Sequence, residues 1–254
     1  MDWQKFTTLK EQLNRPFVMA HRGSSAILPE NTLTAFQRAL ADGADILETD
    51  LRFSKDGQIV LMHDETVDRT TFGHGPVQGH TLSEIKNLSV KPLQEAEPTA
   101  ESPPSLLELI EMTEAQTPLA LELKDPQFSQ PAYAEKLVRL LADFDLVDQC
   151  IILSFALPRL QAVQRVAPSL AAGWITMTHP SPNHPVEFIG PFWPLLFLNP
   201  FYMAAARKLG KIICPLDPTP EPRLGLYLKM GLDVVLTNDP AVTFQALARH
   251  ISPD

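Results

Sequence analysis

The chain is poor in several residue types, and each shortage argues against a class of protein. Only two of its 254 residues are cysteines, Cys150 and Cys214, which is too few for a disulfide scaffold or a thiolate metal site. Basic residues number 21 against 30 acidic ones, and the formal net charge of -9 disfavours binding to nucleic acid. The opening residues MDWQKFTTLK lack the basic and apolar segments of a signal peptide. We therefore expect a cytoplasmic protein with no nucleic-acid partner.

The chain also lacks a long uninterrupted apolar stretch. Its most apolar segment, residues 186–206, contains Glu187, Asn199 and three prolines. A membrane-spanning helix needs about 20 consecutive apolar residues, so no stable membrane insertion is expected. Apolar residues nevertheless make up 44% of the chain, which is enough to fill a sizeable core and excludes wholesale disorder.

Short apolar runs alternate with amphipathic segments along most of the chain. Eight runs predict strands that are buried on both faces, at residues 17–21, 46–53, 119–123, 151–155, 171–176, 195–199, 211–216 and 234–237. Apolar residues at helical spacing predict helices at residues 33–41, 132–142, 157–166, 203–209, 222–230 and 242–250. Eight strand–helix units in about 250 residues are typical of an α/β fold of the (β/α)8 TIM-barrel type.

Two segments interrupt the alternation. Asp56 and Gly57 lie between two apolar runs and predict a hairpin that adds a ribbon to the second strand. The stretch from 70 to 104 has no strong period, so we expect an insertion at about 54–104 within a single domain of residues 1–254. Residues 178–194 are too rich in proline for an ordinary helix.

Polar side chains gather where the first predicted strands end, which is the end of a TIM barrel that carries the active site. In chain order they are His21, Arg22, Glu48, Asp50, His63, Asp64, Glu122 and Lys124. Alternate residues of a strand share a face, so Glu48 and Asp50 point the same way, and Glu122 joins them from the neighbouring strand. Three carboxylates without compensation repel one another, which predicts one divalent cation, Mg²⁺ or Ca²⁺, bound by these hard oxygen ligands.

The remaining residues of this set suit an anionic substrate. Arg22 offers a planar fork that can grip a phosphate, and Lys124 adds a fixed positive charge. His21 and His63 titrate near neutral pH and can supply the base and the acid that cleavage of a phosphodiester requires. The combination predicts phosphodiester chemistry.

Other candidates have ordinary structural explanations. Asn31 is expected to cap the helix that follows it, and Cys214 to be a small buried hydrophobe. Four further histidines are expected to be surface or loop residues: His74, His80, His179 and His184.

Residues 21–71 resemble the opening of the glycerophosphodiester phosphodiesterase family of the bacterial cytoplasmic type. The resemblance rests on His21-Arg22-Gly23, Pro29-Glu30-Asn31-Thr32, Ala35-Phe36, Gly43-Ala44-Asp45, Glu48-x-Asp50, Asp56-Gly57, His63-Asp64 and Arg69-Thr70-Thr71. Glu122-x-Lys124, Ser154-Phe155 and residues 237–240 extend it more thinly toward the C-terminus.

The resemblance implies a barrel enzyme that hydrolyses glycerophosphodiesters to glycerol 3-phosphate and an alcohol. It implies that His21 and His63 form the acid–base pair and that a glycerol hydroxyl of the substrate attacks phosphorus first. The resulting cyclic phosphate is then opened by water. The same resemblance makes Glu48, Asp50 and Glu122 the metal ligands, and Arg22 and Lys124 the phosphate-binding residues.

The chain departs from the family pattern at three places, which we expect on the far side of the barrel from the acid–base pair. One is the fifth strand–helix unit, which is rich in proline rather than helical. Residues 214–217 read CPLD where the family carries a Trp-Thr-Val-Asn run, and Asn238 stands where an Asp is usual. Two alternatives stay open: a lysophospholipase D whose acyl chain meets aromatic side chains, and a non-catalytic barrel that binds a phosphorylated metabolite. The aromatic side chains are Phe188, Phe192, Trp193, Phe197 and Phe201.

Overall fold

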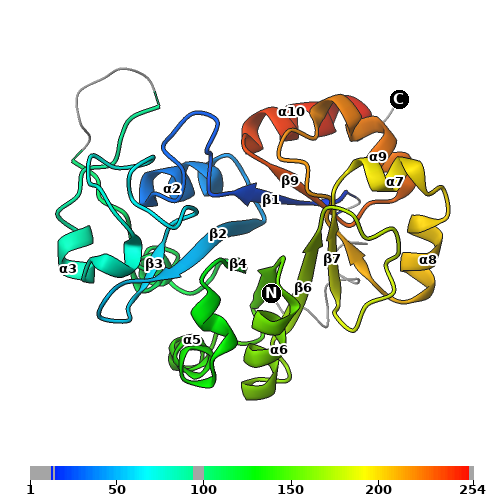
Figure 1. Cartoon of the computed structure of the whole chain (residues 1–254). Coiled ribbons are helices and arrows are strands. Elements are labelled where there is room, and N and C mark those ends of the chain that lie inside the picture. The colour runs from blue at the N-terminus through cyan, green and yellow to red at the C-terminus, as the bar shows by residue number, and fades with distance from the viewer. Residues whose placement is uncertain (1–12, 14, 94–99, 252–254) are drawn as a thin grey trace.

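Parallel strands line the middle of the molecule and helices surround them, in a nearly closed barrel (Figure 1). The computed structural model describes residues 13, 15–93 and 100–251. Eight parallel strands follow the order β8-β7-β6-β5-β4-β2-β1-β9. They are β1 (Phe17–His21), β2 (Ile46–Phe53), β4 (Leu119–Leu123), β5 (Cys150–Ser154), β6 (Ala171–Thr176), β7 (Phe188–Pro191), β8 (Ile212–Ile213) and β9 (Val234–Thr237). The predicted TIM barrel is confirmed.

The barrel closes between β8 and β9 through bonds outside the strand ladder. The backbone N–H of Ile213 in β8 donates to the Asp233 side chain just before β9, at 2.9 Å. The N–H of Asn238, just after β9, donates to the carbonyl of Pro218 at 2.9 Å. These bonds satisfy backbone groups that would otherwise be left unpaired at the ends of the sheet.

Most helices lie where the apolar spacing predicts them. Thr32 caps α2 by accepting a hydrogen bond from the Ala35 N–H, and Pro131 begins α5 at a position where the missing N–H costs nothing. A left-handed Gly231 (φ 65°) ends α9. The helices around the barrel are α2 (Leu33–Ala41), α5 (Pro131–Asp143), α6 (Leu157–Val166), α7 (Pro194–Leu198), α8 (Tyr202–Lys208), α9 (Leu224–Met230) and α10 (Pro240–Ile251).

The strands bury side chains on both faces, as their continuous hydrophobicity predicts. An inner cluster includes Met19, Ile46 and Ala120, and a larger outer cluster packs against the helices. Because alternate residues of a strand share a face, the positions two residues further on are His21, Glu48 and Glu122. The alternation that fills the lower barrel with apolar groups therefore places polar groups at its carboxyl end.

A ribbon and short helices occupy the segment between β2 and β4. Strand β3 (Ile59–Leu61) pairs antiparallel with β2, which confirms the hairpin predicted at Asp56 and Gly57. The segment also holds η2 (Val77–Gly79), α3 (Leu82–Ile85) and α4 (Leu106–Met112), and it has a small apolar core of its own around Val67. Residues 94–99 lie outside the described part of the chain.

The strand predicted at 195–199 is wrong. These residues belong mostly to helix α7, while the sixth parallel strand is β7, inside the segment expected to be a loop. A short continuous apolar run does not distinguish a buried helix from a buried strand, and Pro194 suits the first turn of a helix. Strand β7 was not predicted because it contains Gly190 and Pro191, and both residue types are poor strand formers.

Candidate active site

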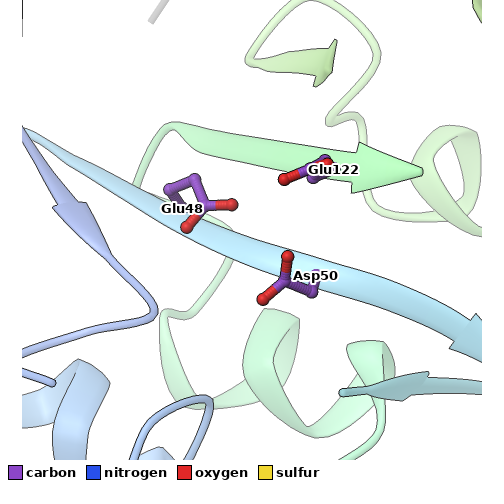
Figure 2. A group of neighbouring side chains, drawn as sticks. All are labelled: Glu48, Asp50 and Glu122. Carbon is purple, nitrogen blue, oxygen red and sulfur yellow. The ribbon is translucent and has the colours of Figure 1, made fainter. Parts of the chain in front are cut away.

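Three carboxylates form the centre of the site. Glu48 and Asp50 lie on β2 and Glu122 lies on β4, where Asp50 and Glu122 are paired in register. All three are at least 95% buried, and their ligand oxygens lie within 4.8 Å of one another. Figure 2 shows the three carboxylate groups turned toward one another across the two strands. The sequence therefore predicted this cluster correctly.

The three carboxylates differ in pKa because burial, mutual repulsion and neighbouring positive charges act on them unequally. Burial, followed by the negative charge of Asp50, raises the pKa of Glu48 well above its ordinary value and that of Glu122 to about 7. Burial also acts to raise the pKa of Asp50, but the positive charges of Arg22 and Lys124 outweigh it and hold that pKa below its ordinary value. The neighbouring positive charges thus favour the ionised form of Asp50, whereas burial and repulsion favour the protonated forms of Glu48 and Glu122.

The cluster has the chemistry of a metal site. One Asp50 oxygen, Oδ1, is buried without a hydrogen-bond partner among the described residues, although the Lys124 Nζ lies 3.5 Å from it. Buried carboxylate oxygens that lack partners are costly unless a cation satisfies them. Three hard oxygen donors within 4.8 Å fit a divalent ion such as Mg²⁺ or Ca²⁺.

Two positively charged side chains, Arg22 and Lys124, contact the carboxylates. The Arg22 Nε lies 2.9 Å from Asp50 Oδ2, and the Lys124 Nζ lies 2.8 Å from Glu122 Oε1. The backbone N–H of Arg22 also donates to Glu48 Oε2 at 3.1 Å. Arg22 and Lys124 are therefore joined to the carboxylates by contacts, as their positions after β1 and β4 predict.

A tight turn after β1 holds Arg22 in place. Arg22 has a left-handed φ of 58°, and Gly23 follows with a φ of 81°. A Cβ on Gly23 would lie 2.6 Å from the backbone carbon of Ala35 in α2. Only glycine combines this backbone conformation with such a close approach, so the glycine after Arg22 is a structural requirement of the site.

His21 is a partly buried imidazole held by an amide. Its Nδ1 lies 2.7 Å from Asn238 Oδ1, which also accepts a hydrogen bond from the Ser25 hydroxyl at 3.1 Å. Because the amide oxygen can only accept, Nδ1 carries the proton and Nε2 is left as the basic nitrogen. Burial, followed by the charge of Arg22, lowers the pKa of His21 to about 4, so the ring is neutral at pH 7.

His63 is held by a carboxylate. It follows β3, and its Nδ1 lies 2.7 Å from Asp64 Oδ1. The guanidinium of Arg52 donates twice to the His63 carbonyl, at 2.8 and 3.0 Å, which fixes the backbone. Burial lowers the pKa of His63, and the charge of Asp50 and the hydrogen bond to Asp64 act in the opposite direction.

The histidines line two different hollows. His21, Glu48 and Glu122 line a pocket of about 490 Å³, its open mouth included, while His63 lines a smaller one of about 240 Å³ with Glu30 and Asn31. The negative charge of Asp50 nevertheless acts to raise the pKa of both imidazoles. The structure thus joins the carboxylates to Arg22 and Lys124 by contact and places the two histidines in separate pockets.

The larger pocket is polar on one side and apolar on the other. The polar side comes from β1, β2 and β4, and Cys214 lies among the apolar residues. Cys214 was predicted to be buried, but it is only partly buried because it lines this pocket. The apolar side chains of this pocket are Met19, Leu153, Ile175, Phe188, Ile189, Cys214, Pro215, Leu216 and Leu236. Of the aromatic residues of segment 186–206, Phe188 lines this pocket and Phe201 is 76% exposed.

Four further residues contact the site, and the sequence reasoning assigned none of them a role there. Asn31 does not cap α2, because Thr32 does; Asn31 instead donates to Asp50 Oδ2 at 2.9 Å. Asp64 contacts His63 and Arg69. The expectation that Asn238 lies on the far side of the barrel from the acid–base pair is wrong, because Asn238 contacts His21. Asp64 is next to a candidate histidine, which is a usable signal, whereas Asn31, Arg69 and Asn238 reach the site only through the tertiary fold.

The other expectations for histidines and for membrane insertion can be compared with the structure. His74 is an exposed residue paired with Asp68, and His179 and His184 pack on the Trp174 ring in the loop after β6. The His80 Nε2 lies 3.0 Å from the carbonyl of His74, away from the site. Within the described residues, the longest apolar helices fall short of what a bilayer crossing needs.

Comparisons with known proteins agree with the geometry of this site. Residues 21–193 match the family described as the glycerophosphoryl diester phosphodiesterase family. A glycerophosphodiester phosphodiesterase of Caldanaerobacter subterraneus subsp. tengcongensis is 33% identical over 233 residues, which cover 89% of this chain and 95% of that protein. The chain belongs to the glycerophosphoryl diester phosphodiesterase family.

Solved structures share the fold over almost their whole length. A glycerophosphodiester phosphodiesterase from Agrobacterium tumefaciens is 27% identical, with a TM-score of 0.78 over 89% of this chain and 98% of that one. An Oleispira antarctica phosphodiesterase in complex with the product sn-glycerol-3-phosphate is 25% identical, with a TM-score of 0.79 over 93% of this chain and 98% of that one. The class of the chain is therefore that of a phosphoric diester hydrolase.

Proposed function

We propose that this chain hydrolyses glycerophosphodiesters to glycerol 3-phosphate and an alcohol, with one divalent ion and a pair of histidines. The observation that carries the proposal is the buried cluster of Glu48, Asp50 and Glu122 with Arg22 and Lys124 in contact with it. Carboxylates and cations packed this closely provide places for both a metal ion and the oxygens of a phosphate. The product bound to the Oleispira antarctica relative supports the same substrate class.

Each charged residue has a distinct task in this proposal. Glu48, Asp50 and Glu122 bind Mg²⁺ or Ca²⁺, which when bound supplies positive charge for the phosphoryl oxygens. Arg22 and Lys124 bind the phosphate of the substrate, Arg22 through its planar fork and Lys124 as a point charge. Because the fold holds both cations in advance, they need little rearrangement to stabilise charge that grows in the transition state.

His21 and His63 exchange protons with the substrate. One imidazole, neutral, accepts the proton of a glycerol hydroxyl as its oxygen bonds to phosphorus. The other enters the step as an imidazolium and gives its Nε2 proton to the leaving alcohol as its bond to phosphorus breaks. The cyclic phosphate then takes up water, and the two histidines return to their starting protonation states. Each ring uses Nε2 for this exchange, because each Nδ1 is bound to Asn238 or Asp64.

A second candidate is a lysophospholipase D, whose substrate carries one acyl chain. The apolar side of the larger pocket, with Phe188 and Leu216, favours it. A non-catalytic binding barrel is disfavoured, because every residue assigned a chemical task is present.

We also infer that the segment at about 54–104 is an insertion within one domain of residues 1–254, and that the enzyme works in the cytoplasm. The two free cysteines support a reducing compartment.

The purified protein is assayed with glycerophosphocholine, glycerophosphoethanolamine and lysophosphatidylcholine, each with Mg²⁺, with Ca²⁺ and with a chelator. Release of glycerol 3-phosphate that needs metal supports the proposal, whereas release of lysophosphatidic acid alone supports the second candidate. His63→Ala is expected to lower kcat by about 10²- to 10⁴-fold. His74→Ala is the matched control, because His74 is an exposed histidine of the same segment. Equal activity of His63→Ala and wild type would contradict the assigned pair.

A further inference from the structure

Arg69 makes contacts on two sides of the candidate site. Its Nε is ion-paired with Asp64 Oδ2, and its Nη1 and Nη2 donate to the two oxygens of Glu30 at 2.8 and 2.7 Å. Arg69 comes from the segment after β3, whereas Glu30 comes from the loop between β1 and α2. One guanidinium therefore connects two loops from different parts of the barrel end.

The first set of contacts, which we call the first arm, runs from Arg69 through Asp64 to His63. Asp64 uses Oδ1 to hold His63 Nδ1 at 2.7 Å and Oδ2 to accept from Arg69. With both oxygens engaged, the carboxylate cannot rotate away from the imidazole without losing a charge-assisted bond. Bonds to Arg69 and His63 also outweigh burial and hold the pKa of Asp64 at about 2, so Asp64 stays ionised. The ionised carboxylate keeps the proton of neutral His63 on Nδ1.

The second arm ends at Arg22. Glu30 Oε1 accepts from Arg22 Nη1 at 3.1 Å as well as from Arg69 Nη2. Burial acts to raise the pKa of Glu30, but Arg69 and Arg22 lower it below its ordinary value, so Glu30 is a carboxylate between two guanidinium groups. Arg22 thus meets Glu30 on one side and Asp50 on the other, and the orientation of its fork depends on both.

The two arms require the shape of arginine. Arg69 uses Nε toward Asp64 and both terminal nitrogens toward Glu30, which is a planar pattern of donors that a lysine ammonium cannot reproduce. Its side chain is still 49% exposed, so it reaches solvent and not the carboxylate cluster. Arg69 therefore acts on the site through other residues.

We propose that Arg69 is a positioning residue that fixes the imidazole of His63 and the guanidinium of Arg22 relative to one another. The inference rests on the proposed function, because it assigns Arg69 a task toward the acid–base pair and the phosphate-binding residue. Arg69 itself touches no reacting atom. Without it, Asp64 and Glu30 each lose a partner, and both the imidazole and the phosphate-binding fork gain freedom to turn.

The test compares Arg69→Ala with Arg38→Ala in the whole protein. Arg38 is the matched control, because it is 47% exposed and ion-paired with Asp42 on the surface of α2. Arg69→Ala is expected to lower kcat by about 10- to 100-fold, the loss typical when an outer partner of a site residue is removed. Added methylguanidinium is expected to restore activity to Arg69→Ala, because the space left by the arginine side chain is open to solvent. Added methylammonium is not expected to restore it. Arg69→Lys is expected to stay impaired.

A second readout does not depend on turnover. Nitrogen-15 NMR of His63 in the wild type is expected to show the proton on Nδ1, and in Arg69→Ala this preference is expected to weaken. The affinity for Ca²⁺ in the absence of substrate is expected to stay within about twofold of wild type, because Arg69 contacts none of the metal ligands.

The outcomes separate this inference from the proposed function. Wild-type kcat/KM in Arg69→Ala would overturn the inference, and so would a loss of activity that parallels losses of melting temperature and Ca²⁺ affinity and that methylguanidinium does not restore. The second result would mean that Arg69 only fastens the two loops together. If the wild type itself hydrolyses none of the substrates, the proposed function fails, and the NMR signal of His63 still decides whether Arg69 positions the imidazole.

Discussion

The Nδ1 atom of His21 lies 2.7 Å from Oδ1 of Asn238, a residue 217 positions further along the chain. This bond joins the end of β1 to the residue that follows β9, and so it forms only when the first and last strands of the barrel are paired. An amide at this position keeps the imidazole in one tautomer, and its hydrogen bond raises the pKa of His21 by less than burial and Arg22 lower it. The pairing of the terminal strands therefore sets the protonation of a candidate catalytic group.

Asn238→Asp is expected to raise the pKa of His21. A carboxylate 2.7 Å from the ring would stabilise the imidazolium more than the neutral amide does, and a shift of about 1 to 3 units is typical of such a pair. The limb of the pH–rate profile that belongs to His21 is then expected to move to higher pH. Asn87→Asp, at an exposed asparagine, is the control. Identical profiles for Asn238→Asp and wild type would mean that His21 does not titrate during turnover.

Metal affinity is expected to rise with pH. Glu122 has a pKa of about 7 and must lose its proton before it can bind a cation. Release of this proton alone makes the affinity about tenfold higher at pH 8 than at pH 6, and the raised pKa of Glu48 steepens the rise, as calorimetry with Ca²⁺ or Mg²⁺ would measure. Glu122→Gln is expected to weaken binding and flatten the pH dependence, whereas Glu111→Gln, at an exposed glutamate, changes neither. A flat profile for the wild type would contradict the assignment.

The metal-free protein is expected to lose stability as the pH rises from 6.5 to 8.5. The pKa values of Glu48 and Glu122 are raised in the folded chain, so the folded state binds protons that the unfolded state has already released. This contribution to the free energy of unfolding is fully present below the ordinary glutamate pKa and is lost as the pH passes through the raised value. The low pKa of His21 changes stability only at lower pH.

Urea unfolding in the presence of a chelator measures this loss. The wild type is expected to show a falling midpoint between pH 6.5 and 8.5, and saturating metal is expected to remove the fall because the ion stabilises the charged carboxylates. A midpoint that rises over this range without metal would contradict the raised pKa values.

Gly23→Ala is expected to cost more stability than Gly210→Ala. Both glycines have a left-handed φ, of 81° and 64°, which costs an alanine about 1 kcal/mol or more. Only at Gly23 would the new Cβ also meet the backbone of Ala35, at 2.6 Å, whereas nothing lies within 4 Å of it at Gly210. Thermal unfolding should therefore separate the two variants, and Gly23→Ala should also lose activity as Arg22 is displaced. Equal melting temperatures would show that the turn relaxes freely.

The fold was predictable because strand runs such as 17–21 and 46–53 are continuously apolar and lie at regular distances along the chain. The strand predicted at 195–199 failed because packing, not local sequence, decides whether a short apolar run is a helix. The carboxylates were predictable from their spacing of two on a strand. Arg69 and Asn238 were not, because each depends on a side-chain contact with a residue from a distant loop or strand.

The pocket beside the carboxylates is shared unequally between two arcs of the barrel. The polar lining comes from β1, β2 and β4, while most of the apolar lining comes from β5, β6, β7 and residues 214–216, with Met19 of β1 and Leu236 of β9 beside them. Residues 214–216 follow β8 and lie on that second arc. Substitutions on the second arc can therefore change the size and polarity of the pocket while the polar side chains of the first arc stay in place. In this architecture, selectivity and chemistry can evolve separately.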